Sequence, residues 1–132
     1  MVFASLWKLI SGDRSAPAVR DRGRVGEAHA TKYLEAKGLR ILARNWRCSI
    51  GELDIVAKQG ENIVFVEVKS AGKESDFRPE DRVNREKQMR IKRLARAYLK
   101  SQRLDAPVRY DIVTVIWHED QIKIEHFENA FI

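Results

Sequence analysis

The chain has 132 residues with a net charge of +6, and 44% of its residues are hydrophobic. This length fits one compact domain, and no segment approaches the roughly 20 apolar residues of a membrane-spanning helix. The single cysteine, Cys48, excludes an intramolecular disulfide and argues against a cysteine-based zinc site. The positive charge favours a polyanionic partner, either nucleic acid or an acidic membrane surface.

The first part of the chain predicts a tail and one helix. Residues 1–18 start with an apolar segment that lacks a basic signal-peptide region and is broken by Lys8. We therefore expect a flexible N-terminal tail and a cytoplasmic protein. A helix is predicted from Val19 or Asp21 to Lys37, and Gly38 is well placed as its C-terminal cap.

The rest of the chain predicts five strands and a second helix. Residues 71–81 are polar and contain a proline, so they predict a loop, and a helix is predicted over Asp81–Ser101. The predicted strands are residues 39–46, 52–58, 62–69, 108–117 and 121–127. Residues 19–132 are thus expected to form a single α/β domain, a mixed β-sheet flanked by helices in the order α-β-β-β-α-β-β.

The second predicted helix is strongly basic. Its only acidic residue after the opening Asp81 is Glu86. Such a helix can simply present a solvated face, or it can contact the phosphate backbone of a nucleic acid. The basic residues of this segment are Arg82, Arg85, Lys87, Arg90, Lys92, Arg93, Arg96, Lys100 and Arg103.

The hairpin of residues 52–69 brings charged residues together. Val64, Val66 and Val68 share one face of the last strand and are suited to packing under a helix, whereas Glu67 and Lys69 lie on the other face. If Gly60 and Glu61 form a two-residue turn, Gln59 pairs with Asn62. That register places Asp54 opposite Glu67, and Glu52 opposite Lys69.

Two facing carboxylates repel each other unless a cation lies between them. A hard divalent cation, Mg²⁺ or Mn²⁺, accepts such ligands, and Lys69 would point at the same place. The alternative is a solvent-facing ladder in which Glu52 pairs with Lys69, and spacing alone favours this ladder. Glu27 falls on the inward side of the first helix. A metal ion, a basic partner or the helix dipole near the helix start would explain an acid there.

The histidines His29, His118 and His126 have no metal-ligand spacing and are interpreted as ordinary polar residues.

Residues 26–71, GEAHATKYLEAKGLRILARNWRCSIGELDIVAKQGENIVFVEVKSA, followed by the basic helix and by RYDIV, resemble a known family. This is the YraN-like family of small uncharacterised bacterial proteins. The resemblance covers Gly23 to Trp117, and its GELD and VFVEVK segments carry most of the specificity. It implies the restriction-endonuclease-like, PD-(D/E)xK fold, similar to that of archaeal Holliday-junction resolvases.

The resemblance also implies a set of site residues. Asp54 and Glu67 would bind Mg²⁺ or Mn²⁺ and Lys69 would be the catalytic lysine, while Glu27 would complete the metal site. Gln88 matches a polar position that approaches the site in some related nucleases. Positions expected to contact nucleic acid are Arg44, Arg47, Lys87, Gln88 and Arg90.

Two further parts of the family pattern concern other positions. Arg109 and Asp111 match a later RxD segment, for which we expect a structural role. The chain departs from the pattern after Lys69, because Ser70, Ala71 and Gly72 stand where the family often has a basic residue.

The resulting hypothesis is a metal-dependent endonuclease that binds DNA, branched or damaged, and hydrolyses phosphodiester bonds. One alternative is a nucleic-acid-binding module that has the nuclease-like fold and no activity. A protein that binds other partners or a membrane surface through the basic helix is disfavoured, because it leaves Asp54, Glu67 and Lys69 without a role. Related resolvases act as symmetric dimers, so the resemblance allows a homodimer.

Overall fold

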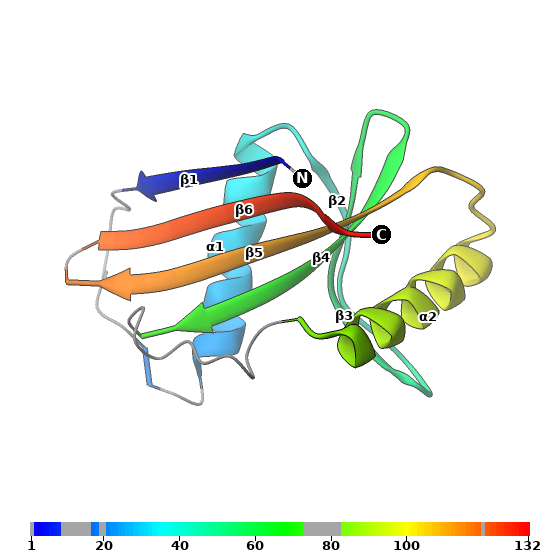
Figure 1. Ribbon diagram of the computed structural model, residues 1–132, viewed down its shortest axis with the longest axis horizontal. Coiled ribbons are helices and arrows are strands. Elements are labelled where there is room, and N and C mark those ends of the chain that lie inside the picture. Colours follow the sequence, from blue (N-terminus) through cyan, green and yellow to red (C-terminus); the bar gives the residue numbers. More distant parts are fainter. Residues whose placement is uncertain (1, 9–16, 19–20, 73–82, 120) are drawn as a thin grey trace.

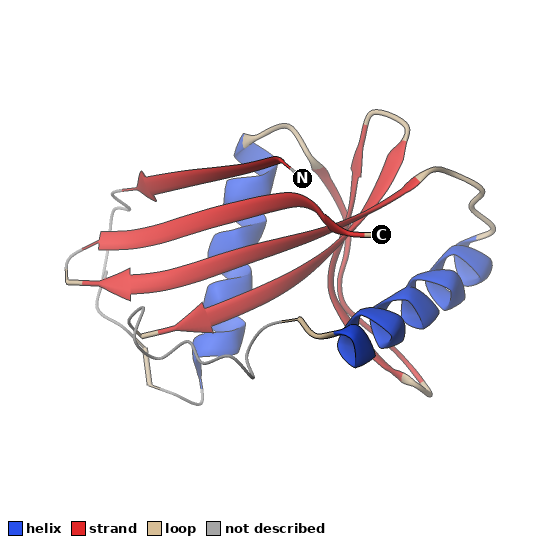
Figure 2. Cartoon of the chain, viewed as in Figure 1, coloured by secondary structure: helices blue, strands red, loops and turns tan. Residues whose placement is uncertain are grey.

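The computed structural model describes residues 2–8, 17–18, 21–72, 83–119 and 121–132 (Figures 1 and 2). They form two helices and six strands in one α/β domain. The elements are β1 (Val2–Lys8), α1 (Arg22–Ala36), β2 (Arg40–Cys48), β3 (Gly51–Gln59), β4 (Asn62–Ala71), α2 (Arg85–Gln102), β5 (Val108–His118) and β6 (Gln121–Phe131). None of the helices in these residues is long and apolar enough to cross a membrane.

The strands form one mixed sheet in the order β1-β6-β5-β4-β3-β2. Strands β4 and β5 are parallel, and α2 lies in the connection between them; all the other neighbouring strands are antiparallel. The predicted mixed sheet and the predicted order of five strands and two helices are therefore confirmed.

The structure adds a strand where the sequence predicts only a tail. Residues 2–8 form β1, which pairs with β6 from Val2 opposite Glu128 to Lys8 opposite Ile122. This pairing satisfies the free backbone groups along the edge of β6, which otherwise would be an exposed edge. Residues 9–16 of the predicted tail lie outside the described residues.

The two helices cover opposite faces of the sheet, and each face has its own apolar core (Figure 1). On one face, Ala30 and Leu34 of α1 pack against Val64 and Val66, as the predicted valine face of β4 requires. On the other face, Leu94 of α2 packs in the cluster that contains Ile63 and Phe65. Alternating residues of β4 thus serve two cores.

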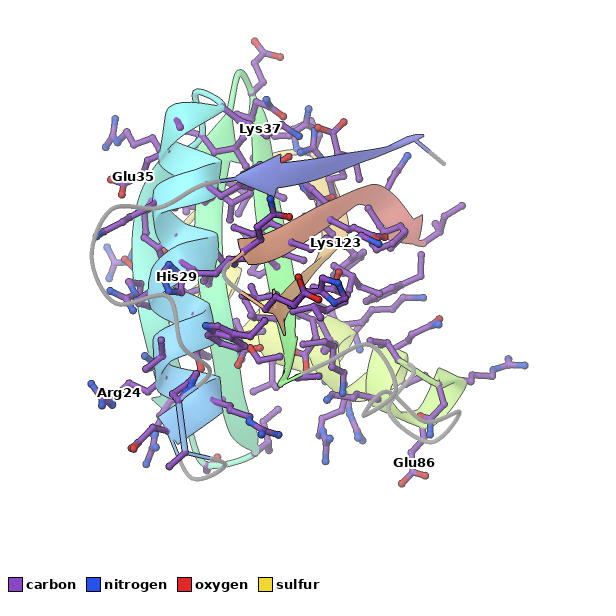
Figure 3. The ribbon with its side chains drawn as sticks, turned by 90° about the vertical axis from the view of Figure 1, so that its left-hand side faces the viewer. Arg24, His29, Glu35, Lys37, Glu86 and Lys123 are labelled. Carbon is purple, nitrogen blue, oxygen red and sulfur yellow. The ribbon has the colours of Figure 1, made fainter. Side chains whose placement is uncertain are left out.

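Helix α2 begins four residues later than predicted. The Asn84 side chain caps its first turn by accepting a hydrogen bond from the Lys87 backbone N–H at 2.9 Å. This cap sets the helical phase of the residues that follow, so that Lys87 faces the sheet whereas Glu86 points away from the domain (Figure 3). Residues 81 and 82 lie outside the described residues.

Candidate active site and nucleic-acid interface

The candidate site lies where β3 and β4 separate. Their pairing runs from Gln59–Asn62 to Ile55–Val66, which confirms the predicted register over these residues, and Gly60 has the positive φ of 59° that the turn requires. Beyond this point the regular ladder ends. The predicted pairs of Asp54 with Glu67 and of Glu52 with Lys69 do not belong to this ladder. The Val68 backbone N–H instead donates a hydrogen bond to Asp54 Oδ2 at 2.9 Å, so the Asp54 side chain bridges the two strands.

Asp54 and Glu67 come together at this point. The two carboxyl groups lie close enough for the charge of Glu67 to act on Asp54, and both can ionise readily only if a cation lies between them. Burial and the neighbouring Glu67 charge raise the pKa of Asp54 to about 8, although the Val68 N–H opposes this rise. A carboxyl with a pKa so far above its ordinary value is more typical of a functional site than of a surface ladder.

Lys87 of α2 reaches this acidic pair. Its Nζ lies 2.6 Å from Glu67 Oε1, and the two side chains are 27% and 13% exposed. Burial alone would lower the pKa of Lys87, but the hydrogen bond and charge of Glu67 outweigh burial and raise it. Lys69 and Asp54 also lie near enough to affect Lys87. The sequence predicts Lys87 as a nucleic-acid contact, whereas the structure directs it to the acids.

Asn45 links two further acids. Its side-chain amide, oriented with the NH₂ group toward the carboxylates, donates to Glu27 Oε1 at 2.6 Å and to Glu52 Oε1 at 2.8 Å. Asn45 lies opposite Asp54 in the β2–β3 register and has a φ of 51°, a left-handed conformation that asparagine tolerates better than most residues. The resemblance implies that Asn45, with Arg44 and Arg47, contacts phosphate, and its contacts with the acids were not predicted.

Glu27 is part of the same electrostatic environment. Burial and the charge of Glu52 raise the pKa of Glu27, and Glu67 contributes in the same direction, whereas Arg44 and the Asn45 hydrogen bond lower it. Glu27 therefore lies close enough to the acidic pair to respond to its charge. The place of Glu27 in the site stays a prediction.

Glu52 does not form the alternative salt-bridge ladder with Lys69. Its carboxylate pairs with Arg47 across the β2–β3 hairpin, with 2.7 Å between Nε and Oε2. Lys69 lies beside β5, opposite Thr114, and its side chain approaches Lys87. Lys69 thus remains on the side of the acidic pair.

The site offers few side chains that could bind a metal ion. Within the described residues, no three His, Cys, Asp or Glu side chains are grouped closely enough to hold a metal ion. Mg²⁺ commonly uses only one or two carboxylates, and water and substrate phosphate complete its coordination. Asp54 and Glu67 fit that mode because they are adjacent carboxyl groups in a half-buried position. The role of Glu27 as a ligand stays a prediction.

The departure at Ser70 has a packing explanation. A Cβ atom on Gly26 of α1 would lie 1.8 Å from Ser70 Oγ and 2.9 Å from Ser70 Cβ. Ser70 Oγ is buried and has no hydrogen-bond partner, and Ala71 is only 4% exposed. A long basic side chain at position 70 would therefore collide with α1, so the close helix–strand contact accounts for the small residue.

This contact predicts that Gly26→Ala lowers the free energy of unfolding by about 1–3 kcal/mol, the usual cost of overpacking. Urea unfolding measures it. Gly23→Ala is the matched control, because nothing lies within 4 Å of a Cβ there. Adding Ser70→Gly to Gly26→Ala should restore most of the lost stability. Equal effects at Gly23 and Gly26 would contradict this account.

The predicted nucleic-acid residues differ in their surroundings. Arg44, Arg47 and Arg90 are exposed, whereas Gln88 donates its side-chain amide to the Val83 carbonyl at 3.0 Å. Along α2 the structure contains a groove that is open to solvent and that no acidic side chain lines among the described residues. Its lining residues are Arg85, Gln88, Met89, Lys92, Arg93, Arg96 and Ile132.

Arg109 and Asp111 form a buried ionic network away from the acidic pair. Asp111 is 0% exposed and accepts two 2.9 Å hydrogen bonds from Arg109, one from His126 Nε2 at 2.8 Å and one from the Asn129 N–H. These contacts outweigh burial and lower the pKa of Asp111. Lys37, labelled in Figure 3, approaches His126 Nδ1 at 2.7 Å. The expected structural role of Asp111 agrees with this geometry.

The interpretation of His126 as an ordinary polar residue was wrong. It is fully buried and connects the end of α1 to the centre of β5. Because the Lys37 ammonium can only donate, Nδ1 of a neutral His126 accepts and its Nε2 carries the proton given to Asp111. No sequence pattern indicates a contact between Lys37 and His126, which are 89 residues apart.

The fold and this site define a class of protein: a small α/β domain with an acidic pair and a lysine at the open end of a mixed sheet. The comparisons with known proteins show the family to which the chain belongs. The sequence profile of the uncharacterised protein family UPF0102 matches residues 26–115, and the chain belongs to this family. The resemblance to YraN-like proteins is thus confirmed.

Relatives from several bacteria match over most of their length. A UPF0102 protein of Syntrophus aciditrophicus is 44% identical over 110 residues, which cover 83% of this chain and 87% of the relative. Those of Alkaliphilus oremlandii and Moorella thermoacetica are also 44% identical, over 112 and 110 residues. They cover 96% and 91% of the relatives and 83% of this chain.

Proposed function

We propose that this protein is a divalent-cation-dependent endonuclease that acts on DNA. The observation that carries the proposal is the neighbouring pair of Asp54, which the Val68 N–H holds at 2.9 Å, and Glu67, with a raised pKa at Asp54 and with Lys69 on the same side. A pair of carboxyls that cannot both ionise without a cation is suited to Mg²⁺ or Mn²⁺.

Each residue has a role in this proposal. Asp54 and Glu67 would hold the cation, which supplies Lewis-acid polarisation of a phosphate and a lowered pKa of bound water. The Val68 N–H fixes the Asp54 carboxylate by its 2.9 Å hydrogen bond. Lys69 would stabilise negative charge that develops on the phosphate, or orient or deprotonate the attacking water. The Asn45 amide holds Glu27 toward the site.

The α2 groove would hold the nucleic acid. Arg85 and Arg96 lie 11 residues apart on α2, which corresponds to about 16 Å of helix. This length matches about five steps of a DNA strand at roughly 3.4 Å each. In the part of the chain that the structure describes, the groove presents cationic side chains and neither an acidic nor an aromatic one. Contacts would therefore be made with the phosphate backbone and carry little sequence preference.

The groove makes a direct prediction. Arg93→Glu combined with Arg96→Glu should weaken binding to duplex DNA about 10–100-fold near 100 mM salt and reduce the salt dependence by about two contacts. Fluorescence anisotropy over a salt series measures both quantities. The control is Arg24→Glu with Lys32→Glu, which makes the same charge change on exposed positions of α1. Equal losses in both variants would show that net charge, and not the groove, sets affinity.

Cleavage tests the proposal itself. Purified protein is incubated with linear, nicked, flapped and four-way-junction DNA with and without Mn²⁺, beside a Lys69→Ala variant. Mn²⁺-dependent cleavage that is lost in Lys69→Ala supports the endonuclease. Salt-sensitive binding of every substrate without any cleavage would favour the binding module. Cleavage that survives in Lys69→Ala would point to a contaminating nuclease.

A further inference from the structure

Lys87 is in an unusual place for a residue of a nucleic-acid-binding helix. Its ammonium lies 2.6 Å from Glu67 Oε1, whereas the groove runs along other side chains of the same helix. The Asn84 cap fixes the first turn of α2 and hence the direction of the Lys87 side chain. The ion pair is therefore built into the fold and joins α2 to the end of β4.

The ammonium holds the position in which a cation is needed. It neutralises Glu67 and lies near Asp54, and both acids are the proposed metal ligands. A carboxylate oxygen that accepts a 2.6 Å charge-assisted hydrogen bond is not fully available to a divalent cation. Binding of the cation through that oxygen must break the pair or lengthen it.

We propose that Lys87 is an internal competitor for the divalent cation, and that its ammonium leaves Glu67 when the cation binds. This inference rests on the proposed function, because it concerns the same acidic pair. Lys87 is thus a residue that sets metal affinity, since its ammonium has to be displaced for each cation bound. It also explains why the metal-free acidic pair can be buried without a cation from solution.

Mn²⁺ binding in the absence of nucleic acid tests this inference. Free Mn²⁺ is measured by electron paramagnetic resonance during titration of the wild-type protein and of Lys87→Met, Lys87→Arg, Lys92→Met and Glu67→Gln. Lys87→Met should bind Mn²⁺ about 10-fold or more tightly, because a hydrogen bond to a charged group no longer opposes binding. Lys87→Arg keeps a cation and should bind no more tightly than the wild type.

The control variants distinguish failure of the proposed competition from failure of the proposed metal site. Lys92→Met removes a charge from the same helix without touching Glu67, so it should change the affinity less than about 2-fold. If Mn²⁺ binds through Glu67 but Lys87→Met binds it no more tightly than Lys92→Met, the competition is overturned and the metal site stands. If the wild type binds no Mn²⁺, or Glu67→Gln binds it equally well, the metal site and the inference both fail.

The melting temperature provides a second test, which applies even if Lys87→Met is poorly folded at low cation concentration. Loss of the ammonium leaves Glu67 and Asp54 facing each other, so the melting temperature of the metal-free variant should fall. Saturating Mg²⁺ should then raise the melting temperature of Lys87→Met more than that of the wild type, because ligand binding stabilises the folded state. An equal rise in both proteins would overturn the proposed competition.

Discussion

Asp54→Asn is expected to make the metal-free protein more stable at neutral pH and to abolish metal-dependent cleavage. Burial and Glu67 raise the pKa of Asp54 to about 8, so its ionised form is disfavoured in the folded protein. Asparagine has no charge to bury and can still accept the Val68 hydrogen bond. We expect the free energy of unfolding at pH 8 to rise by about 1–3 kcal/mol, as measured by urea denaturation.

The pH dependence has a definite sign. Between pH 4 and pH 8 the folded protein retains a proton on Asp54 that the unfolded chain, with the ordinary pKa near 3.8, has released. The folded state therefore binds more protons, and wild-type stability should fall as pH rises through this window. The slope should be shallower in Asp54→Asn, and Glu61→Gln in the exposed turn serves as the control. Parallel pH curves for wild type and Asp54→Asn would contradict the assignment.

Asp111→Ala is expected to have the largest effect on stability of any single substitution considered. It leaves Arg109, which is 15% exposed, and the fully buried His126 without their common acceptor. Breaking a buried ion pair in this way costs about 3–5 kcal/mol, which would unfold much of a marginally stable domain. Urea unfolding at pH 7 measures the loss.

Two variants test whether the network causes this loss. Asp111→Asn keeps an oxygen for Arg109 or the Asn129 N–H and should lose less stability than Asp111→Ala. Asp105→Ala removes an exposed carboxylate and should change the free energy of unfolding by less than about 0.5 kcal/mol. A loss at Asp111 no greater than that at Asp105 would mean that the network contributes nothing to stability.

The hairpin was predictable because its determinants are local. Gly60 supplies the positive φ of a two-residue turn, and the turn then fixes which residues of β3 and β4 pair. Strand alternation explains why Val64 and Val66 face α1 while Glu67 is directed to the opposite side. Beyond Ile55–Val66 the ladder ends and the Asp54 side chain accepts a hydrogen bond from the Val68 N–H, which was not predicted.

Contacts between segments that are distant in the sequence could not be predicted from sequence patterns. Lys87 belongs to a run of basic residues, and only the Asn84 cap and the packing of α2 distinguish it from its neighbours. Asn45 pairs with acids from α1 and β3, and His126 joins residues from α1 and β5. Strand β1 forms because β6 has a free edge, which depends on the completed sheet. None of these has a local periodicity that would reveal it.

The position of a bound cation tests the central claim most directly. Crystals soaked in Mn²⁺ and measured near its absorption edge would show an anomalous peak wherever the ion binds. The proposal predicts one strong peak within about 2–2.6 Å of oxygens from both Asp54 and Glu67, with the Lys87 ammonium moved away from Glu67. A fully soaked crystal without a peak at these carboxylates, and with Lys87 still on Glu67, would contradict it.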